Sequence, residues 1–97
     1  MMDFEQEIEQ VETWLKSGDA RALAALCRMR EKMPRHAYVI EQCYGVGCVA
    51  IAQTAIARAI GISSNRVWQL RNRGLRDLRD YIYHGRGFNS VPWPERK

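Results

Sequence analysis

Residues 53–72 carry an alanine, a glycine and a valine at offsets that few short folds require together. Two helices that cross at roughly 90–120° need a small side chain where they touch, and Ala57 supplies one. Gly61 can adopt a positive φ without the Cβ clash of other residues, so it suits a tight corner. Val67 would point back from a second helix into the space between the two. This spacing predicts a helix-turn-helix.

Apolar residues recur at helical spacing through most of the chain, and helix caps separate the repeats. Asp19 and Ser63 are placed to cap the helices that follow them, Ser63 by accepting from the N–H of Asn65 or Arg66. Pro34 either ends one helix or opens the next. The predicted helices cover about residues 3–16, 19–33, 34–44, 53–60 and 64–83. The expected apolar positions of the second helix are Leu23, Leu26, Cys27 and Met33.

The expected fold class is all-α, a small helical bundle of about five helices that ends in the helix-turn-helix. With 97 residues, the chain has room for one small core. Residues 1–33 are expected to form a helical hairpin for dimerisation or partner contact, residues 34–84 the helix-turn-helix region, and residues 85–97 an irregular tail. The tail is expected to fray, unless it folds back or docks a partner through Trp93. Gly74, within the last helix, marks a bend or a close helix contact.

Charge is distributed unevenly along the chain. Residues 1–17 contain five acids and one lysine, whereas residues 53–97 contain nine bases and three acids. A basic half centred on one helix is typical of nucleic-acid contact, because lysine and arginine release counterions from phosphates; a solvated basic face is the alternative. The acidic start does not resemble a secretory signal, and no apolar stretch is long enough to cross a bilayer. We therefore expect a cytoplasmic protein without a membrane partner.

Cysteine and histidine positions argue against a disulfide framework, a metal site or catalysis. The chain has three cysteines, Cys27, Cys43 and Cys48, an odd number that in the absence of an export signal disfavours a disulfide framework. Cys43, Cys48 and His36 lack a second pair of ligands at zinc-site spacing, so no metal or other cofactor is expected. Neither His36 nor His84 accompanies a nucleophile motif, and no phosphate-binding loop is present. No catalytic residues, and so no enzyme, are predicted.

From Pro34 onward the chain resembles region 4 of bacterial sigma factors, over about half its length. The stretch MPRHAYVIEQCYGVG has that family's proline, Val-Ile-Glu core and closing Tyr-Gly. The stretch AIARAIGISSNRVWQLRNRGLRDLR has its alanine-containing helix, Gly-Ile-Ser corner, Arg-Val pair and Leu-Arg-x-Leu-Arg ending. In that family the domain reads the −35 promoter element and touches the RNA polymerase flap. The resemblance therefore implies DNA and RNA polymerase as partners.

The chain departs from this family at the start of the predicted recognition helix. Sigma factors usually have an Arg-Glu pair where this chain has Ser64 and Asn65, and often an arginine where it has Trp68. The −35 preference is therefore not carried over, and residues 1–33 are too short to hold the other sigma regions. Residues 53–72 also resemble the Cro and repressor helix-turn-helix of phages, which often opens with Gln-Thr. A small phage or prophage regulator, including an antitermination protein, fits both resemblances.

The first turns of the recognition helix carry the predicted base contacts, because a helix in the major groove presents its N-terminal residues to base edges. These residues are Ser64, Asn65, Trp68 and Gln69. Asn65 and Gln69 lie four apart on one face, and either amide can pair with adenine N6 and N7, with Gln69 the first choice. Trp68 would pack on a thymine methyl group or, alternatively, bury itself against the helix at 34–44.

Arginines around this face are predicted to contact phosphates: Arg58, Arg66, Arg71 and Arg73. Further along the helix, Arg73, Arg76 and Arg79 either contact DNA or pair with Asp77 or Asp80. The residues expected in the core rather than at the DNA are Ala57, Ile60, Ile62, Val67, Leu70 and Leu78.

The expected function is a sequence-specific transcription regulator that binds double-stranded DNA through residues 64–80. One helix reads few base pairs, so selectivity needs a second source. A homodimer joined through the acidic first helix would add a half-site roughly 34 Å away. The alternative is an RNA polymerase-associated factor, sigma-like or antiterminating, which polymerase positions. A third possibility is an adaptor that occupies polymerase through the acidic helix and Trp93. A fourth is a helical interaction domain without a DNA role.

Overall fold

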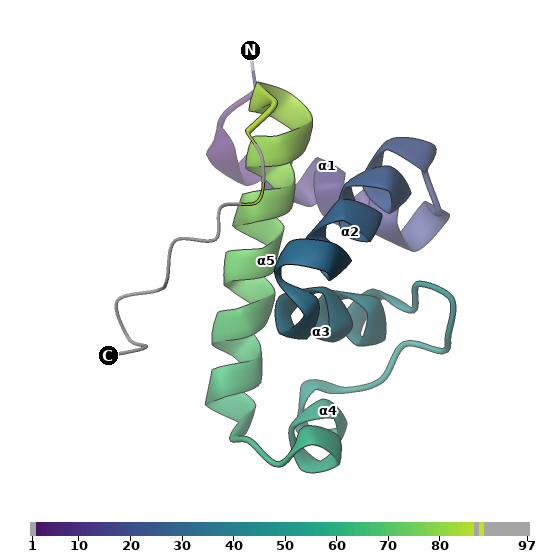
Figure 1. Ribbon diagram of the computed structural model, residues 1–97, viewed down its shortest axis with the longest axis vertical. Helices are drawn as coiled ribbons and strands as arrows, with labels where there is room; N and C mark the ends of the chain where they lie inside the picture. Colours follow the sequence, from purple (N-terminus) through teal and green to yellow (C-terminus); the bar gives the residue numbers. More distant parts are fainter. Residues whose placement is uncertain (1, 87, 89–97) are drawn as a thin grey trace.

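The computed structural model describes residues 2–86 and residue 88. These residues form five helices and no strand, which confirms the all-α prediction. Figure 1 shows the longest helix, α5, running the length of the molecule, with α1 and α2 at one end, α4 at the other and α3 between them. The helices are α1 (Phe4–Ser17), α2 (Ala20–Lys32), α3 (Pro34–Tyr44), α4 (Gln53–Ile60) and α5 (Ser64–His84).

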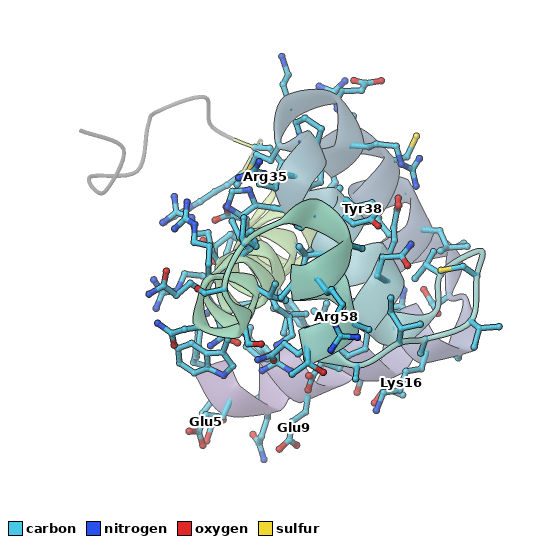
Figure 2. All side chains as sticks on the ribbon, turned by 90° about the horizontal axis from the view of Figure 1, so that it is seen from below. Glu5, Glu9, Lys16, Arg35, Tyr38 and Arg58 are labelled. Carbon is cyan, nitrogen blue, oxygen red and sulfur yellow. The ribbon has the colours of Figure 1, made fainter. Side chains whose placement is uncertain are left out.

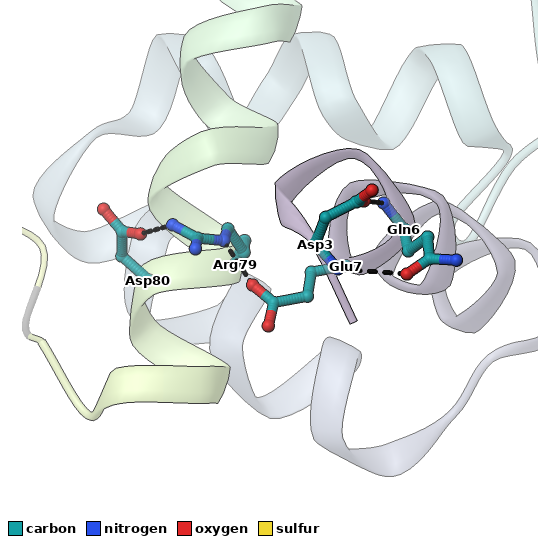
Figure 3. Close-up of polar contacts among 5 residues, drawn as sticks. All are labelled: Asp3, Gln6, Glu7, Arg79 and Asp80. Atoms are coloured by element: carbon teal, nitrogen blue, oxygen red, sulfur yellow. Dashed lines mark hydrogen bonds and ion pairs between the residues drawn. The ribbon is translucent and has the colours of Figure 1, made fainter. Parts of the chain in front are cut away.

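Local signals set the helix ends, and all of them lie within one residue of the predicted bounds. Asp3 and Gln6 form a capping box at the start of α1, in which the Gln6 N–H donates to Asp3 Oδ1 at 2.8 Å (Figure 3). Asp19 caps α2 by accepting from the Arg21 N–H at 2.8 Å. Pro34 opens α3, where its missing N–H costs no helical hydrogen bond.

The larger hydrophobic core joins the two ends of the chain. Its buried residues come from α1, α2, α3 and α5: Val11, Leu15, Ala22, Ala25, Leu26, Met29, Ala37, Ile40, Leu75 and Leu78, with Phe88 beyond α5. Removal of this apolar surface from water is the main stabilising contribution to the fold. Because residues 1–33 and 34–84 share the same core, α1 and α2 are structural parts of the helix bundle.

A smaller core lies between α3, α4 and the first half of α5. Its buried residues are Val39, Ile56, Ala57, Val67 and Leu70, and Ile60 and Ile62 pack against them while partly exposed. The predicted core positions are therefore confirmed at Ala57, Val67, Leu70 and Leu78, which are at most 5% exposed. Since α3 and α5 contribute to both cores, they connect the two ends of the molecule.

Gly74 marks a close helix contact and not a bend. It is buried in the middle of α5, and a Cβ placed there would lie 3.0 Å from Ile40 Cγ1 of α3. Absence of a side chain at this position lets α3 and α5 approach each other.

The predicted buried face of α2 is wrong at two positions. Leu23 is 39% exposed and Cys27 is exposed. The buried residues are instead Ala22, Ala25, Leu26 and Met29, which also recur at helical spacing. Small alanine side chains on this face let α2 pack closely on its neighbours, whereas the periodicity alone fits either face.

The chain beyond α5 turns back onto the bundle at Phe88. Gly85, with φ 69°, ends α5, and Phe88 stacks on Tyr81 with ring centroids 4.9 Å apart. Phe88 is 7% exposed, so the prediction of a frayed tail is wrong at this residue, because the ring finds apolar surface beside α5. Trp93 lies outside the described residues. Within the described part of the chain, no helix has the length and apolar character needed to span a membrane.

Candidate nucleic-acid interface

The α4–α5 corner begins at Gly61, which adopts φ 73° and ψ 35°. The N–H groups of Gly61 and Ile62 both donate to the Ala57 carbonyl, at 2.9 and 3.0 Å, and close the last turn of α4. Ser63 Oγ then accepts from the Arg66 N–H at 3.1 Å and caps α5, as predicted. Three residues therefore suffice to pass from one helix to the next.

Buried side chains fix the angle between these two helices. Val67, on the first turns of α5, is fully buried with Ile56 and Ala57 of α4. Val39 of α3 belongs to the same cluster, so a third helix supports the corner from behind. Close packing of this kind holds the start of α5 in one orientation.

The start of α5 presents three of the four predicted base-contacting side chains to solvent. Asn65, Trp68 and Gln69 are exposed, and Ser64 is half-buried. Trp68 is 48% exposed, so the alternative that it buries itself against α3 is wrong. The buried positions beneath the corner are occupied by smaller apolar side chains of α3, α4 and α5.

Two side-chain hydrogen bonds organise this surface. Gln53 Nε2, at the start of α4, donates to the Ser64 carbonyl at 3.3 Å and ties α4 to the first residue of α5. Arg66 Nη1 donates to Gln69 Oε1 at 3.3 Å, which holds the Gln69 amide on the exposed face. Gln53 was not among the predicted site residues. Its bond to a backbone carbonyl depends on the folded corner and has no spacing signal in the sequence.

Three of the four predicted phosphate-contacting arginines border this surface. Arg58 is exposed on α4, and Figure 2 shows it on the end of the molecule that α4 forms. Arg66 and Arg73 are half-buried on α5. Arg73 Nε lies 3.1 Å from Asp77 Oδ2, one of the two pairings predicted for it. Burial raises the pKa of the Asp77 carboxyl, and the Arg73 charge opposes that shift.

Arg71 lies apart from the other three arginines. Its Nε is buried without a hydrogen-bond partner among the described residues, and its Nη2 donates to Asn72 Oδ1 at 3.0 Å. Burial raises the pKa of the Cys43 thiol and of Tyr44, and the nearby Arg71 charge opposes both shifts. Arg71 is therefore placed toward α3 and away from the exposed face of Trp68 and Gln69.

A hollow of about 350 Å³ lies on the outer side of α5. The described residues that line it are Arg66, Trp68, Gln69, Leu70, Asn72, Arg73 and Arg76. The lining combines guanidinium groups, which can bind phosphates, with amides and one indole, which can contact base edges. Asn72 was not predicted as a contact, although helical spacing from Trp68 places it on the same side of α5. For Arg76, DNA contact was one of the two predicted alternatives, and its place in this lining is compatible with it.

The described ranges contain no group of three or more histidine, cysteine or acidic side chains that is arranged to hold a metal ion. Cys27 and Cys48 are exposed, and Cys43 is half-buried. The chain matches no protein-family profile, no curated protein and no solved structure.

Proposed function

We propose that this chain is a sequence-specific DNA-binding regulator of transcription that reads the major groove with α5. The observation that carries the proposal is the exposure of Asn65, Trp68 and Gln69 at the start of a helix held by a buried corner. Exposed amide and aromatic side chains on the first turns of such a helix have the chemistry to read base edges. The arginines around them have the chemistry to hold phosphates.

Gln69 is assigned the central base contact. A glutamine side chain can donate to adenine N7 and accept from adenine N6 at the same time. In the unbound protein Gln69 Oε1 accepts from Arg66, so binding would exchange this donor for the adenine amino group. Arg66 would then move to a phosphate. Trp68, which is next to Gln69, is assigned apolar contact with a thymine methyl group.

Arg58, Arg66 and Arg73 are assigned the phosphate contacts. They come from both helices of the corner, so they would hold α5 at a fixed depth and register in the groove. Three phosphate contacts imply that the logarithm of the binding constant falls with the logarithm of salt concentration with a slope of roughly −3. We assign the protein a binding role in the cytoplasm, without catalysis or a cofactor.

The second candidate function is an RNA polymerase-associated factor. The apolar stripe of α1, which includes Val11 and Leu15, is buried inside the chain's own core. This burial disfavours a homodimer formed through that stripe. Polymerase docking, as a sigma-like or antitermination factor would use, is then the stronger source of the additional selectivity.

Selection of bound sequences from a random duplex library tests both proposals. The library is bound by the protein alone and by the protein together with RNA polymerase. An enriched motif with the protein alone supports autonomous recognition, and a palindromic motif would indicate a dimer. A motif that appears only with polymerase supports the polymerase-associated factor.

The selection is repeated with the variant Gln69→Ala, and Arg28→Ala is its matched control. Arg28 is exposed on α2, away from the α4–α5 corner, and pairs with Glu31. The Gln69 variant should lose the motif and the Arg28 variant should keep it. Absence of any duplex binding at low salt, with and without polymerase, would overturn the DNA-binding function.

A further inference from the structure

One stripe of α5 runs from the proposed DNA-binding surface to α1. Asn65, Trp68, Asn72, Arg76 and Arg79 recur at intervals of three or four residues, which places them on one side of the helix. Asn65 and Trp68 are exposed, whereas the last part of the stripe meets α1. Eleven residues, or roughly 16 Å of helix, separate Trp68 from Arg79. The first helix therefore meets the same side of α5 as the surface that we assign to DNA, but further along the helix.

Polar and aromatic contacts hold α1 against the end of this stripe. Arg79 Nε donates to Glu7 Oε1 at 2.7 Å, and the two side chains are only 19% and 15% exposed. Arg79 also donates to Asp80, so its guanidinium lies between two carboxylates (Figure 3). The Phe4 ring centroid lies 4.5 Å from Arg79 Cζ and 5.9 Å from Arg76 Cζ. These contacts fix the position of the first turns of α1 relative to α5.

Two more carboxylates on α1 point away from the bundle. Glu5 and Glu9 are exposed and form no ion pair within the described residues. Figure 2 shows both projecting from one edge of the molecule, opposite Arg35, in the view that faces the α4 end. Lys16 lies at the other end of α1. The outer side of α1 therefore carries two carboxylates that have no ion-pair partner among the described residues, and the nearby Arg76 and Arg79 lie on the side of α1 that faces α5.

We propose that Glu5 and Glu9 determine specificity by confining DNA to the first half of α5. This inference rests on the proposed function. A DNA site with matching bases is held at Asn65 and Gln69, away from α1. DNA without matching bases is held by phosphate contacts alone and can shift along the stripe toward Arg76, where the two carboxylates repel it. Non-specific binding is therefore weakened more than specific binding.

The test compares the wild type with Glu5→Gln/Glu9→Gln in binding to a random-sequence duplex and to the sequence selected in the library experiment. Each removed charge should strengthen binding to the random duplex roughly twofold at 10 mM salt, where screening is weak, so about fourfold together. Affinity for the selected site should rise less. The gain should disappear at about 0.15 M salt, where the Debye length is roughly 8 Å. The variant should also show a steeper salt dependence, because DNA gains phosphate contacts near Arg76.

Glu31→Gln provides the control for net charge. Glu31 is exposed near the end of α2, a helix that contributes no residue to the small core beneath the α4–α5 corner. Glu5→Gln alone should strengthen binding to the random duplex more than Glu31→Gln does. Thermal unfolding followed by circular dichroism should show that all the variants remain folded, since the substituted carboxylates are exposed.

Equal gains for Glu5→Gln and Glu31→Gln would overturn the inference, because only net charge would then matter. An equal gain on random and selected DNA would also overturn it. Both outcomes leave the proposed DNA-binding function intact, since the wild type still binds. Failure of the wild type to bind any duplex at low salt would instead overturn the function itself, and the inference with it.

Discussion

Gln69 has a hydrogen bond within the protein and, under the proposed function, also a role in base recognition. Its Oε1 accepts from Arg66 within the unbound protein, and its amide faces solvent on the first turns of α5. The two residues have different chemistry toward DNA. An amide distinguishes bases, whereas a guanidinium that contacts phosphate responds to the charge of any duplex. Their substitution should therefore separate the two contributions.

Gln69→Ala should weaken binding to the selected site by about 1–3 kcal/mol and relax the preference at one base position. Arg66→Ala should weaken binding to all sequences to a similar extent and reduce the salt slope by about one. Titration of both variants against the selected duplex and single-base variants of it, at several salt concentrations, measures these effects. A uniform loss across sequences for Gln69→Ala would contradict direct readout of a base.

Gly74→Ala tests the close contact between α3 and α5. Alanine favours the helix by about 1 kcal/mol, but its Cβ would lie 3.0 Å from Ile40 Cγ1 and 3.2 Å from Cδ1. Ile40 is fully buried, and overpacking of this kind typically costs about 1–3 kcal/mol. We expect urea unfolding to show that Gly74→Ala lowers the free energy of unfolding by roughly 1 kcal/mol. The double variant Gly74→Ala/Ile40→Val should lose less free energy of unfolding than the sum of the losses of the two single variants. A net gain in stability would show that the contact relaxes easily.

At the scale of whole helices, the ends were predictable and the faces only partly so. Capping side chains and a proline act on their immediate neighbours, so Asp3, Asp19, Ser63 and Pro34 mark helix starts by local chemistry. The inward face of α2 depends on what its partners offer, and the sequence pattern fits two different faces. Helical spacing also identified the exposed side chains Asn65 and Gln69, but not the placement of Arg71 toward α3 with its Nε buried.

The contact between α3 and α1 at Tyr44 predicts a dependence of stability on alkaline pH. Tyr44 Oη donates to Glu12 Oε2, and burial together with that bond raises the pKa of Tyr44 above its usual value of 10.0. The folded state therefore favours the protonated phenol. Its contribution is fully present below the unfolded pKa near 10 and is lost as pH rises further toward the folded pKa.

Urea unfolding of the wild type and of Tyr44→Phe at pH 8, 10 and 11 measures this effect. The wild type should be more stable by about 1–2 kcal/mol at pH 8, because the variant leaves Glu12 without its donor. The difference should shrink at pH 11. A difference that stays constant from pH 8 to pH 11 would contradict the link to Tyr44 ionisation.

At the scale of the whole molecule, the shared core makes the helices interdependent. The contacts that create it were not predictable, since they join distant residues: Arg79 bonds to Glu7 across 72 positions, and Phe88 returns to Tyr81. Composition and periodicity describe neighbours along the chain, whereas these contacts arise only when α1 and α5 meet. The predicted division at residue 33 reflects the same difficulty, because α1 and α2 supply part of the core of residues 34–84.

A fragment of residues 34–97 should therefore fail to fold cooperatively. It would expose Ala37, Ile40, Leu75 and Leu78, all of which are at most 3% exposed in the whole chain. Thermal unfolding followed by far-ultraviolet circular dichroism should show one sharp transition for the full chain and a gradual, low-amplitude change for the fragment. A sharp transition for the fragment would show that residues 34–84 form an autonomous domain.

The arrangement of α5 also has a consequence for how this protein can evolve. Its inward residues Val67, Leu70, Gly74, Leu75 and Leu78 are constrained by packing, and its outward residues Asn65, Trp68 and Gln69 alternate with them. Exposed positions tolerate substitution with little effect on stability. Under the proposed function, a few codon changes on one side of α5 would therefore suffice to change the DNA target, while changes on the buried side would cost stability.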